Sequence, residues 1–418
     1  MRHTSRSALL SAVCLLCACS HDVRAERVPA PRVGDPAGER EQSGTEGEAE
    51  GPAAGCALEL LATGDLVLNQ VATEAVLAEG PSGYTSLLAG YAQTRRTRPD
   101  ALAYVNLEHP LVQDRRELHR GWPRLDPEHP ASPPVLGTTP PLADALRAAG
   151  VNVVSLANNH SYDQDHDGLR RTTTELTRVG VAYAGAGETE TEAFAPAWIT
   201  RGGCRVAFFS FTDSFNRRAS DDPPFVAAHL ARRPLALSAL RAARPHADVL
   251  VVAVHWGRDF SPGPRSDLRR LADALVEAGA DVVLGTGPHV LHSVERRESP
   301  RGDAVVAYSL GNFVSGMGRA YRAGHPPRSV RHPANEVPDA LDAVLLEVEV
   351  SLVAERVRIA PLHAIPLFTD NNWLAHRESG GTLPHLIRVR ALSDMPDEVH
   401  AERRPIIARA LGPEVTLR

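Results

Sequence analysis

Short apolar runs separated by amphipathic segments recur along the chain from Ala57 onward. The runs are continuous rather than alternating, which is typical of strands that are buried on both faces of a parallel sheet. They predict strands at Leu58–Ala62, Ala101–Val105, Val151–Leu156, Val206–Ser210, Val249–Val254, Val282–Gly285 and Val305–Tyr308. Because the segments between them have helical character, the pattern predicts an α/β fold in which helices cover a sheet.

Three of the intervening segments have apolar residues at helical spacing, and each is followed by a glycine that suits a helix C-cap. These segments are Pro141–Ala149, Leu169–Val179 and Leu268–Ala278, followed by Gly150, Gly180 and Gly279. Two later apolar runs, Val344–Val350 and Val357–Ile359, predict a hairpin that closes the sheet, and a helix is expected near Pro405–Ala410.

Two segments rich in Pro and His, Arg115–Pro140 and Arg319–Pro338, predict long surface loops. Loops of this length act as functional lids or are disordered insertions, and both interpretations stay open.

Residues 1–19 have the features of a secretory signal, with a basic start, an apolar run and small residues at the end. The Leu16 to Cys19 segment also resembles a bacterial lipobox, which predicts lipidation of Cys19 and attachment to a membrane. The alternative is an ordinary cleaved signal. Residues 20–55 are dominated by Glu, Gly, Pro and Ala and predict a disordered tether. We expect a folded domain over 56–365 and a C-terminal extension over 366–418.

The composition excludes several classes of function. The formal net charge is -6, which argues against a nucleic-acid partner, because such a partner requires a basic excess. The 418 residues include no lysine, so neither Schiff-base chemistry nor a P-loop is available. Beyond the leader, the sequence contains two cysteines, Cys56 and Cys204, which are expected either to form a disulfide or to be free buried thiols.

Polar side chains follow six of the predicted strands. They include Asp65, Glu108, Asn158, Asn159, His160, Asp163, His255, His289 and Asn312. The carboxyl ends of parallel strands meet at one edge of a sheet, where α/β proteins bind ligands. Carboxylates with imidazoles and almost no cysteine suit one or two divalent metal ions, which favours hydrolysis of a phosphoester-type bond. A serine hydrolase is disfavoured because the chain has no G-x-S-x-G elbow.

The order of these motifs closely resembles the CapA family of capsule or poly-γ-glutamate synthesis proteins, whose domain is similar to calcineurin-type metallophosphoesterases. The motifs are Thr63-Gly64-Asp65, Asn106 to Pro110, Ser155 to His160, Gly185 to Gly187, His255-Trp256-Gly257, Pro288-His289-Val290 and Tyr308 to Phe313. The resemblance spans Leu58 to Ile365. It implies a four-layer α-β-β-α metallophosphoesterase-like sandwich and export from the cell.

The resemblance also assigns roles to individual residues. The implied metal ligands are Asp65, Glu108, Asn159, His160, His255 and His289, with His160 or His255 acting in catalysis. Asn158 and Asp163 are expected to orient His160 or brace its loop. Asn312 binds substrate or caps its turn, and both readings stay open.

Two positions depart from the family pattern. Gly287 stands where the family usually has a histidine, and Asp165 stands where it usually has a glycine. Asp165 or His166 can be read as a replacement ligand or as an ordinary loop residue.

From the sequence we expect a lipid-anchored protein of the cell envelope or periplasm, with a metal-dependent hydrolase site. Its expected partners are a surface polymer or its precursor, the membrane through Cys19, and other capsule-synthesis proteins. The alternatives are a non-catalytic polymer-binding or assembly protein on the same fold, and a periplasmic nucleotidase-like phosphoesterase.

Overall fold

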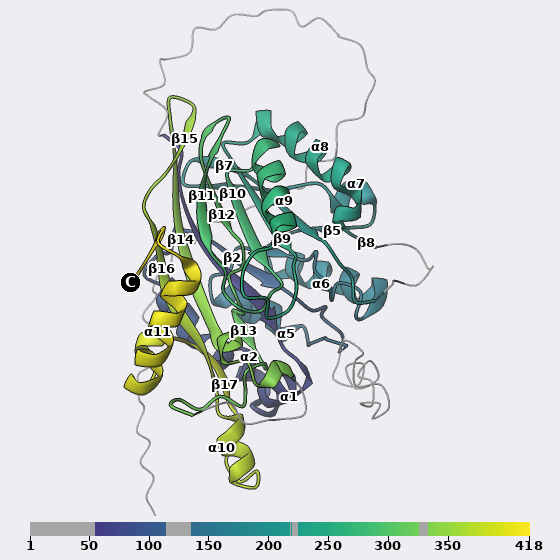
Figure 1. The fold of residues 1–418 in the computed structure, drawn as a ribbon. Coiled ribbons are helices and arrows are strands. Elements are labelled where there is room, and N and C mark those ends of the chain that lie inside the picture. Colours follow the sequence, from purple (N-terminus) through teal and green to yellow (C-terminus); the bar gives the residue numbers. More distant parts are fainter. Residues whose placement is uncertain (1–54, 114–134, 218, 220–224, 326–332) are drawn as a thin grey trace, which may run out of the picture.

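Figure 1 shows the computed structural model, which describes residues 55–113, 135–217, 219, 225–325 and 333–418. The expected signal peptide, Cys19 and nearly all of the expected tether lie outside the described residues, as do parts of both predicted long loops. Within the described ranges, no helix combines the length and the apolar character that crossing a bilayer requires.

The sheet has two halves, and the first half begins with four parallel strands in the order β4-β3-β2-β1. Strand β14 pairs antiparallel with β1, and β16 pairs with β14, β17 and β18. The bounds are β1 (Ala57–Val67), β2 (Leu102–Leu107), β3 (Val153–Ser155), β4 (Ala182–Ala184), β14 (Asp342–Val353), β16 (Leu362–Asn371), β17 (Ile387–Ala391) and β18 (Val415–Leu417).

The second half has the order β12-β10-β9-β7-β6, with β11 beside β12. Its bounds are β6 (Ala197–Arg201), β7 (Cys204–Thr212), β9 (Val249–His255), β10 (Val282–Thr286), β11 (Val294–Ser299) and β12 (Gly302–Ala307). Strand β15 (Arg356–Ile359) joins the halves, because it forms a hairpin with β14 and one parallel pair with β12. Short strands complete the sheets: β13 (Val314–Ser315) beside β1, and the pair β5 (Ala186–Gly187) and β8 (Val226–Ala227). All seven predicted strands and the predicted hairpin are confirmed.

Three hydrophobic clusters define the layers. One cluster lies between the two sheet halves and includes Leu60 of β1, Phe208 of β7 and Leu284 of β10. A second lies on the outer face of the first half, and a third on the outer face of the second half. Alternate residues of β1 divide between these clusters, since Leu60 joins the central one and Leu61 an outer one. The four-layer α-β-β-α arrangement is therefore confirmed.

The helices cover these outer faces as the layering requires (Figure 1). Helices α1 (Gln70–Ala78), α2 (Gly83–Leu87), α3 (Ala89–Arg95), α5 (Pro141–Ala148) and α6 (Asp165–Val179) contribute to the cluster on the first half. Helices α8 (Arg233–Ala243) and α9 (Ser266–Glu277) contribute to the cluster on the second half. The chain also forms α7 (Glu190–Ala193), α10 (Trp373–Glu378) and α11 (Asp397–Leu411).

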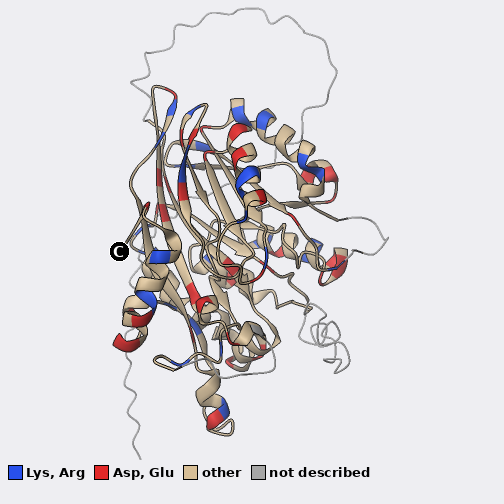
Figure 2. Cartoon of the chain, viewed as in Figure 1, with Lys and Arg blue, Asp and Glu red and all other residues tan. Residues whose placement is uncertain are grey.

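The glycines predicted to end three helices have the required left-handed backbone, with φ of 86° at Gly150, 71° at Gly180 and 116° at Gly279. Figure 2 shows charges of both signs on α9 and α11, whereas the only charged residues of α8 are arginines.

A disulfide joins Cys56, at the start of β1, to Cys204, at the start of β7. It connects the two sheet halves across 148 residues of sequence. Of the two alternatives for this cysteine pair, a disulfide or two free buried thiols, the disulfide is therefore confirmed.

The C-terminal extension continues the same body. The expected boundary between residues 365 and 366 falls inside β16, and β17 and β18 pair with that strand. The expected helix near Pro405 is present as α11 and begins earlier, at Asp397. Its residues Ile407 and Leu411 pack into the central cluster.

Candidate metal centre

Four predicted residues from both sheet halves meet at the carboxyl ends of their strands. Asp65 lies near the end of β1, Glu108 follows β2, His255 ends β9, and His289 follows β10. All four side chains are buried. The parallel pairing explains the convergence, since Asp65 stands beside Asn106 in one half and His255 beside Thr286 in the other.

Hydrogen bonds from both halves hold the carboxylate of Asp65. Asn106 Nδ2 donates to its Oδ1 at 2.6 Å, and the Gly287 backbone N–H donates to its Oδ2 at 3.0 Å. The Nδ1 atom of His255 lies 3.6 Å from Oδ1, and that of His289 lies 3.4 Å from Oδ2. Although burial raises the pKa of Asp65, the two imidazoles outweigh burial and hold that pKa below its usual range.

Glu108 is the residue of this centre whose charge is least compensated. Neither of its buried carboxylate oxygens has a hydrogen-bond partner. Its Oε1 lies 3.6 Å from His255 Nε2 and 3.7 Å from His289 Nε2. Burial, reinforced by the charge of Asp65, raises the pKa of Glu108 well above its usual value. A buried carboxylate without partners is costly unless a cation compensates it.

The ligand atoms of Asp65, Glu108 and His289 all lie within 4.8 Å of one another. Burial lowers the pKa of His289, but Glu108 and Asp65 attract its proton and raise that pKa to about 10. The site therefore favours positive charge where these three side chains meet. Two carboxylates and an imidazole are a suitable donor set for a divalent ion, so the residues present fit a metal.

Of the predicted histidine ligands, His160 and His255 do not belong to this three-residue group. His160 and Asn159 lie on the neighbouring loop. His160 Nδ1 contacts Asp163 Oδ2 at 2.6 Å, and its Nε2 contacts Asn216 Nδ2 at 3.2 Å. Asn159 Oδ1 is buried and has no hydrogen-bond partner. Asn158 Nδ2 donates to Leu107 O at 2.9 Å, which ties the loop to the strand end that carries Glu108.

Several groups that contact the predicted site residues were not predicted from the sequence. Asn106 and the Gly287 N–H bind Asp65, and Asn216 faces His160. Asn106 lay inside a recognised motif, so its place on β2 beside Asp65 was a signal that could have revealed it. Asn216 had no such signal. His109 is also buried, and neither of its ring nitrogens has a hydrogen-bond partner.

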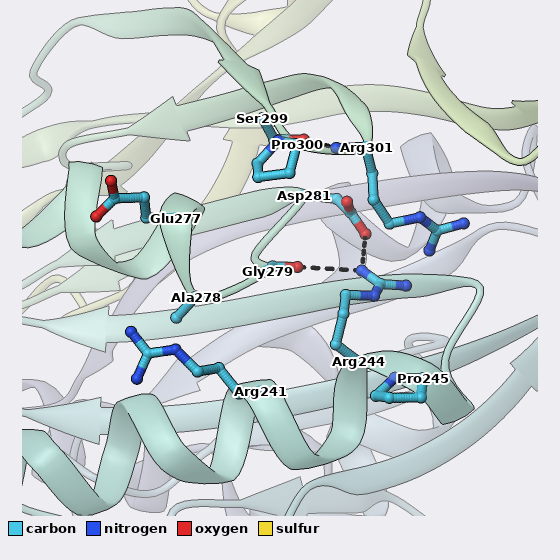
Figure 3. Close-up of a pocket in the computed structure, with 10 residues that line it drawn as sticks. All are labelled: Arg241, Arg244, Pro245, Glu277, Ala278, Gly279, Asp281, Ser299, Pro300 and Arg301. Carbon is cyan, nitrogen blue, oxygen red and sulfur yellow. Dashed lines mark hydrogen bonds and ion pairs between the residues drawn. The ribbon is translucent and has the colours of Figure 1, made fainter.

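A separate pocket of about 280 Å³ lies at the opposite, amino ends of β9 and β10 (Figure 3). It is lined in part by Arg241, Arg244 and Arg301. Arg244 donates to Asp281 and to the carbonyls of Gly279, Ala247 and Asp248, while Arg301 donates to carbonyls of three residues. These donors brace the turns at the strand starts, so the candidate centre remains the one at the carboxyl edge.

The sequence comparison decides the family. The family described as "Bacterial capsule synthesis protein PGA_cap" matches residues 59–317, more than half of the chain. The chain belongs to this family.

Two Bacillus proteins are among the relatives of this PGA_cap chain. "Capsule biosynthesis protein CapA" of Bacillus anthracis is 31% identical over 221 residues, which are 51% of this chain and 50% of that protein. "PGA biosynthesis protein CapA" of Bacillus subtilis is 32% identical over 41% of this chain and 45% of that protein. The chain thus spans about half the length of the curated relatives it matches.

Two solved structures also resemble the chain. A hypothetical protein from Thermus thermophilus is 18% identical with a TM-score of 0.40, covering 74% of this chain and 99% of that one. The calcineurin-like phosphoesterase YfkN from Bacillus subtilis is 11% identical with a TM-score of 0.35, covering 84% of this chain and 97% of that one.

Both positions that depart from the expected pattern have a left-handed backbone. Gly287 has φ of 108°, and a Cβ atom there would lie 2.6 Å from Trp256 O, so this backbone accepts only glycine. Asp165 keeps a left-handed backbone, with φ of 56°, at the position where glycine is usual. Both residues lie in the first turn of α6 rather than in a loop. Asp165 is exposed, His166 is buried with its Nδ1 against the Phe225 backbone, and neither belongs to the metal cluster, so the reading as exposed loop residues is wrong for His166 and the structure does not place either as a replacement ligand.

His289 itself has a left-handed backbone, with φ of 59°. This conformation is uncommon and costly for a residue with a side chain, and such strain concentrates at functional sites.

Proposed function

We propose that this PGA_cap protein is an exported, lipid-anchored accessory protein of capsule or poly-γ-glutamate synthesis with a metal-dependent hydrolase centre. The names of the Bacillus relatives support the process, since they are called capsule and PGA biosynthesis proteins. The leader and the lipobox-like segment ending at Cys19 support export and anchoring.

One observation carries the hydrolase proposal. Glu108 is buried without hydrogen-bond partners and shares a 4.8 Å cluster with Asp65 and His289. The charged form of such a side chain is costly to bury unless a cation compensates it, which is the condition of a metal ligand.

Asp65, Glu108 and His289 would hold a divalent ion, and His255 is the adjacent imidazole. When bound, such an ion supplies a nucleophile at neutral pH and polarises a phosphoryl or carbonyl oxygen. Asp163 accepts from His160 Nδ1, which leaves Nε2 as the atom that exchanges a proton with the substrate. Asn216 must release that nitrogen first.

Metal analysis of the full chain, purified without chelator, tests the centre. We expect about one divalent ion per chain or more, and substantially less in His289→Gln. Turnover of a panel of phosphodiesters, nucleotides and γ-glutamyl peptides then identifies the reaction class. Preferred turnover of nucleotides would instead support a nucleotidase-like phosphoesterase, and a wild-type protein without metal would refute the hydrolase proposal.

The anchor has its own test. We expect wild-type protein in the membrane fraction with incorporated radiolabelled palmitate, and Cys19→Ala to lose the label. Equal release of both proteins from the membrane would contradict lipidation and leave an ordinary cleaved signal.

A second candidate is a non-catalytic protein that holds polymer on this fold. The observation that favours it is Gly287, where the expected imidazole is replaced by a backbone that excludes any side chain. Metal-loaded protein that binds poly-γ-glutamate but turns over no substrate in the panel would support this candidate.

A further inference from the structure

Helix α11 lies outside residues 59–317, which the family model matches, yet it carries a buried arginine that binds a turn near the candidate metal centre. The Arg403 side chain is 2% exposed. Its Nε donates to Asp342 Oδ1 at 3.0 Å, and its Nη2 donates to Asp342 Oδ2 and Asp339 Oδ1 at 2.5 Å each. Asp339 lies in the short 3-10 helix η5 (Pro338–Leu341), and Asp342 follows its last residue. The guanidinium of Arg403 therefore holds both ends of this turn.

The η5 turn also orients the side chain of Asn312. The Asn312 Nδ2 atom donates to Ala340 O at 2.9 Å and to His289 O at 3.3 Å. Both contacts are carbonyl oxygens, so they assign the amide orientation and leave Oδ1 facing His289 Nδ1 at 2.9 Å.

This contact decides which ring nitrogen of His289 can bind a cation. Because an amide oxygen only accepts, Nδ1 keeps its proton whether the ring is neutral or charged. The nitrogen that can present a lone pair is therefore Nε2, which lies on the side of Glu108, 3.7 Å from its Oε1.

A second connection reaches Asp65. Asp342 begins β14, and the next residue, Ala343, forms an isolated antiparallel bridge with Gly311. The carbonyl of Gly311 accepts from the Asp65 backbone N–H at 2.9 Å. The strand start that Arg403 holds is thus connected to two of the three residues in the metal cluster.

We infer that Arg403 is a positioning residue for the metal centre, acting on His289 through η5 and Asn312, and on the Asp65 backbone through Gly311. The inference rests on the proposed function in one respect, that the centre binds metal. A buried ion pair contributes little net stability compared with a well-packed apolar pair, so its geometry is the better explanation for its presence. The C-terminal extension, residues 366–418, would then contribute to the geometry of the metal centre.

The test compares Arg403→Met with Arg404→Met in the full chain. Arg404 is the adjacent arginine of α11, and its Nη2 donates to Leu417 O at 3.2 Å in the C-terminal strand. We expect Arg403→Met to weaken Mn²⁺ binding, measured by calorimetry, about tenfold, the low end of the range for outer partners of metal ligands. Arg404→Met should bind Mn²⁺ as the wild type does.

A second readout needs no metal. The Nδ1–H proton of His289 should give a downfield NMR signal in metal-free wild type, assigned by its absence in His289→Gln. We expect exchange with water to broaden this signal in Arg403→Met and to leave it sharp in Arg404→Met. A purely structural role for Arg403 lowers thermal stability without moving this signal or the affinity.

Removing Arg403 alone leaves Asp342 buried without its cation, so the single variant can fail to fold. The double variant Arg403→Met/Asp342→Asn removes both charges and is expected to fold while keeping the weakened affinity and the broadened signal. A folded single or double variant that binds Mn²⁺ like wild type and keeps the signal overturns the inference. If wild type binds no Mn²⁺, the proposed function fails, and the NMR signal alone decides the role of Arg403.

Discussion

Two buried glutamates in this protein differ in the cations beside them, although the carboxylate oxygens of both lack a hydrogen-bond partner. Glu347 lies 3.2 Å from Arg98 and 2.9 Å from Arg418, whereas Glu108 faces the imidazoles of His255 and His289 at 3.6 and 3.7 Å. The Glu108 carboxylate is arranged for an added cation, and that of Glu347 already has its cations.

Glu108→Gln should separate the effect of the buried Glu108 carboxylate on stability from its effect on metal binding. In chelator we expect Tm to stay at or above the wild-type value, because the amide matches the neutral acid that burial favours. With Mn²⁺ at 100 times its Kd the wild type should gain about 2.7 kcal/mol, and the variant should gain almost none. Thermal unfolding with EDTA and with Mn²⁺ measures both.

Glu347→Gln is the matched control. It should lower Tm in both conditions while keeping the full Mn²⁺ gain. An equal Mn²⁺ gain in wild type and Glu108→Gln would contradict the assignment of Glu108 as a ligand.

Gly287 permits a second prediction at the scale of one residue. Gly287→Ala should destabilise the protein by about 2 kcal/mol or more, because its φ of 108° and the nearby Trp256 carbonyl both oppose a Cβ atom. Denaturant unfolding measures the loss, with Gly263→Ala as the control, since a Cβ there meets nothing within 4 Å. The same geometry predicts that Gly287→His will not restore a ligand, and a gain of metal affinity in that variant would contradict this account.

The candidate ligands were predictable because each follows an apolar strand, and parallel strands bring their ends to one edge. Asp65, Glu108, His255 and His289 satisfy this rule and meet in the structure. His160 satisfies it too, yet its ring is taken up by Asp163 and Asn216. The rule places a residue at the edge but does not specify which neighbours compete for its side chain, and Asn216 comes from a loop without a pattern.

Among the elements, the long buried strands and the helices with glycine caps were predictable, and the short edge elements were not. Strands β4 and β6 have three and five residues, as β3 and β10 do, but they lack the continuous β-branched run that marked those two. The helical segment α1 to α3 was missed because it is broken into short pieces, one with only five residues. The pairing of β14 with both β1 and β16 depends on long-range contacts, which no local pattern encodes.

The Cys56–Cys204 disulfide joins two of the predicted elements and gives a prediction at this scale. Cys56→Ser/Cys204→Ser should lose about 2–5 kcal/mol, because the bond closes a loop of about 148 residues and so restricts the unfolded chain. Thermal unfolding with and without reductant measures this. Reductant should lower the Tm of wild type to that of the variant and leave the variant unchanged; a wild-type Tm insensitive to a reductant that cleaves the bond would contradict the prediction.

At the scale of the whole molecule, the family match ends at residue 317 but the sheet does not. Strand β16 runs through residue 365 and pairs with β14, and α11 supplies Arg403 to Asp342. The strand register and the buried ion pair therefore make residues 366–418 part of the fold.

A chain that ends at Ile365 should not fold. It loses the second half of β16 and leaves Asp342 buried without Arg403, which together exceed the stability of a typical domain. Soluble yield and the presence of a cooperative thermal transition measure the outcome. A chain that begins at Gly55 is the control, expected to keep the wild-type Tm, and a cooperative transition in the shorter chain would show that the extension is dispensable.

The disulfide also determines how the domain would respond to a mechanical pull. Under the proposed anchor at Cys19, force would enter the described body just before Cys56. Without the bond, that force would peel β1 away from β14, one residue pair at a time, starting at Ala57 and Ser351. Because Cys56 is bonded to Cys204, the load passes at once to β7 in the other sheet half, and the strand that carries Asp65 is shielded from the tension.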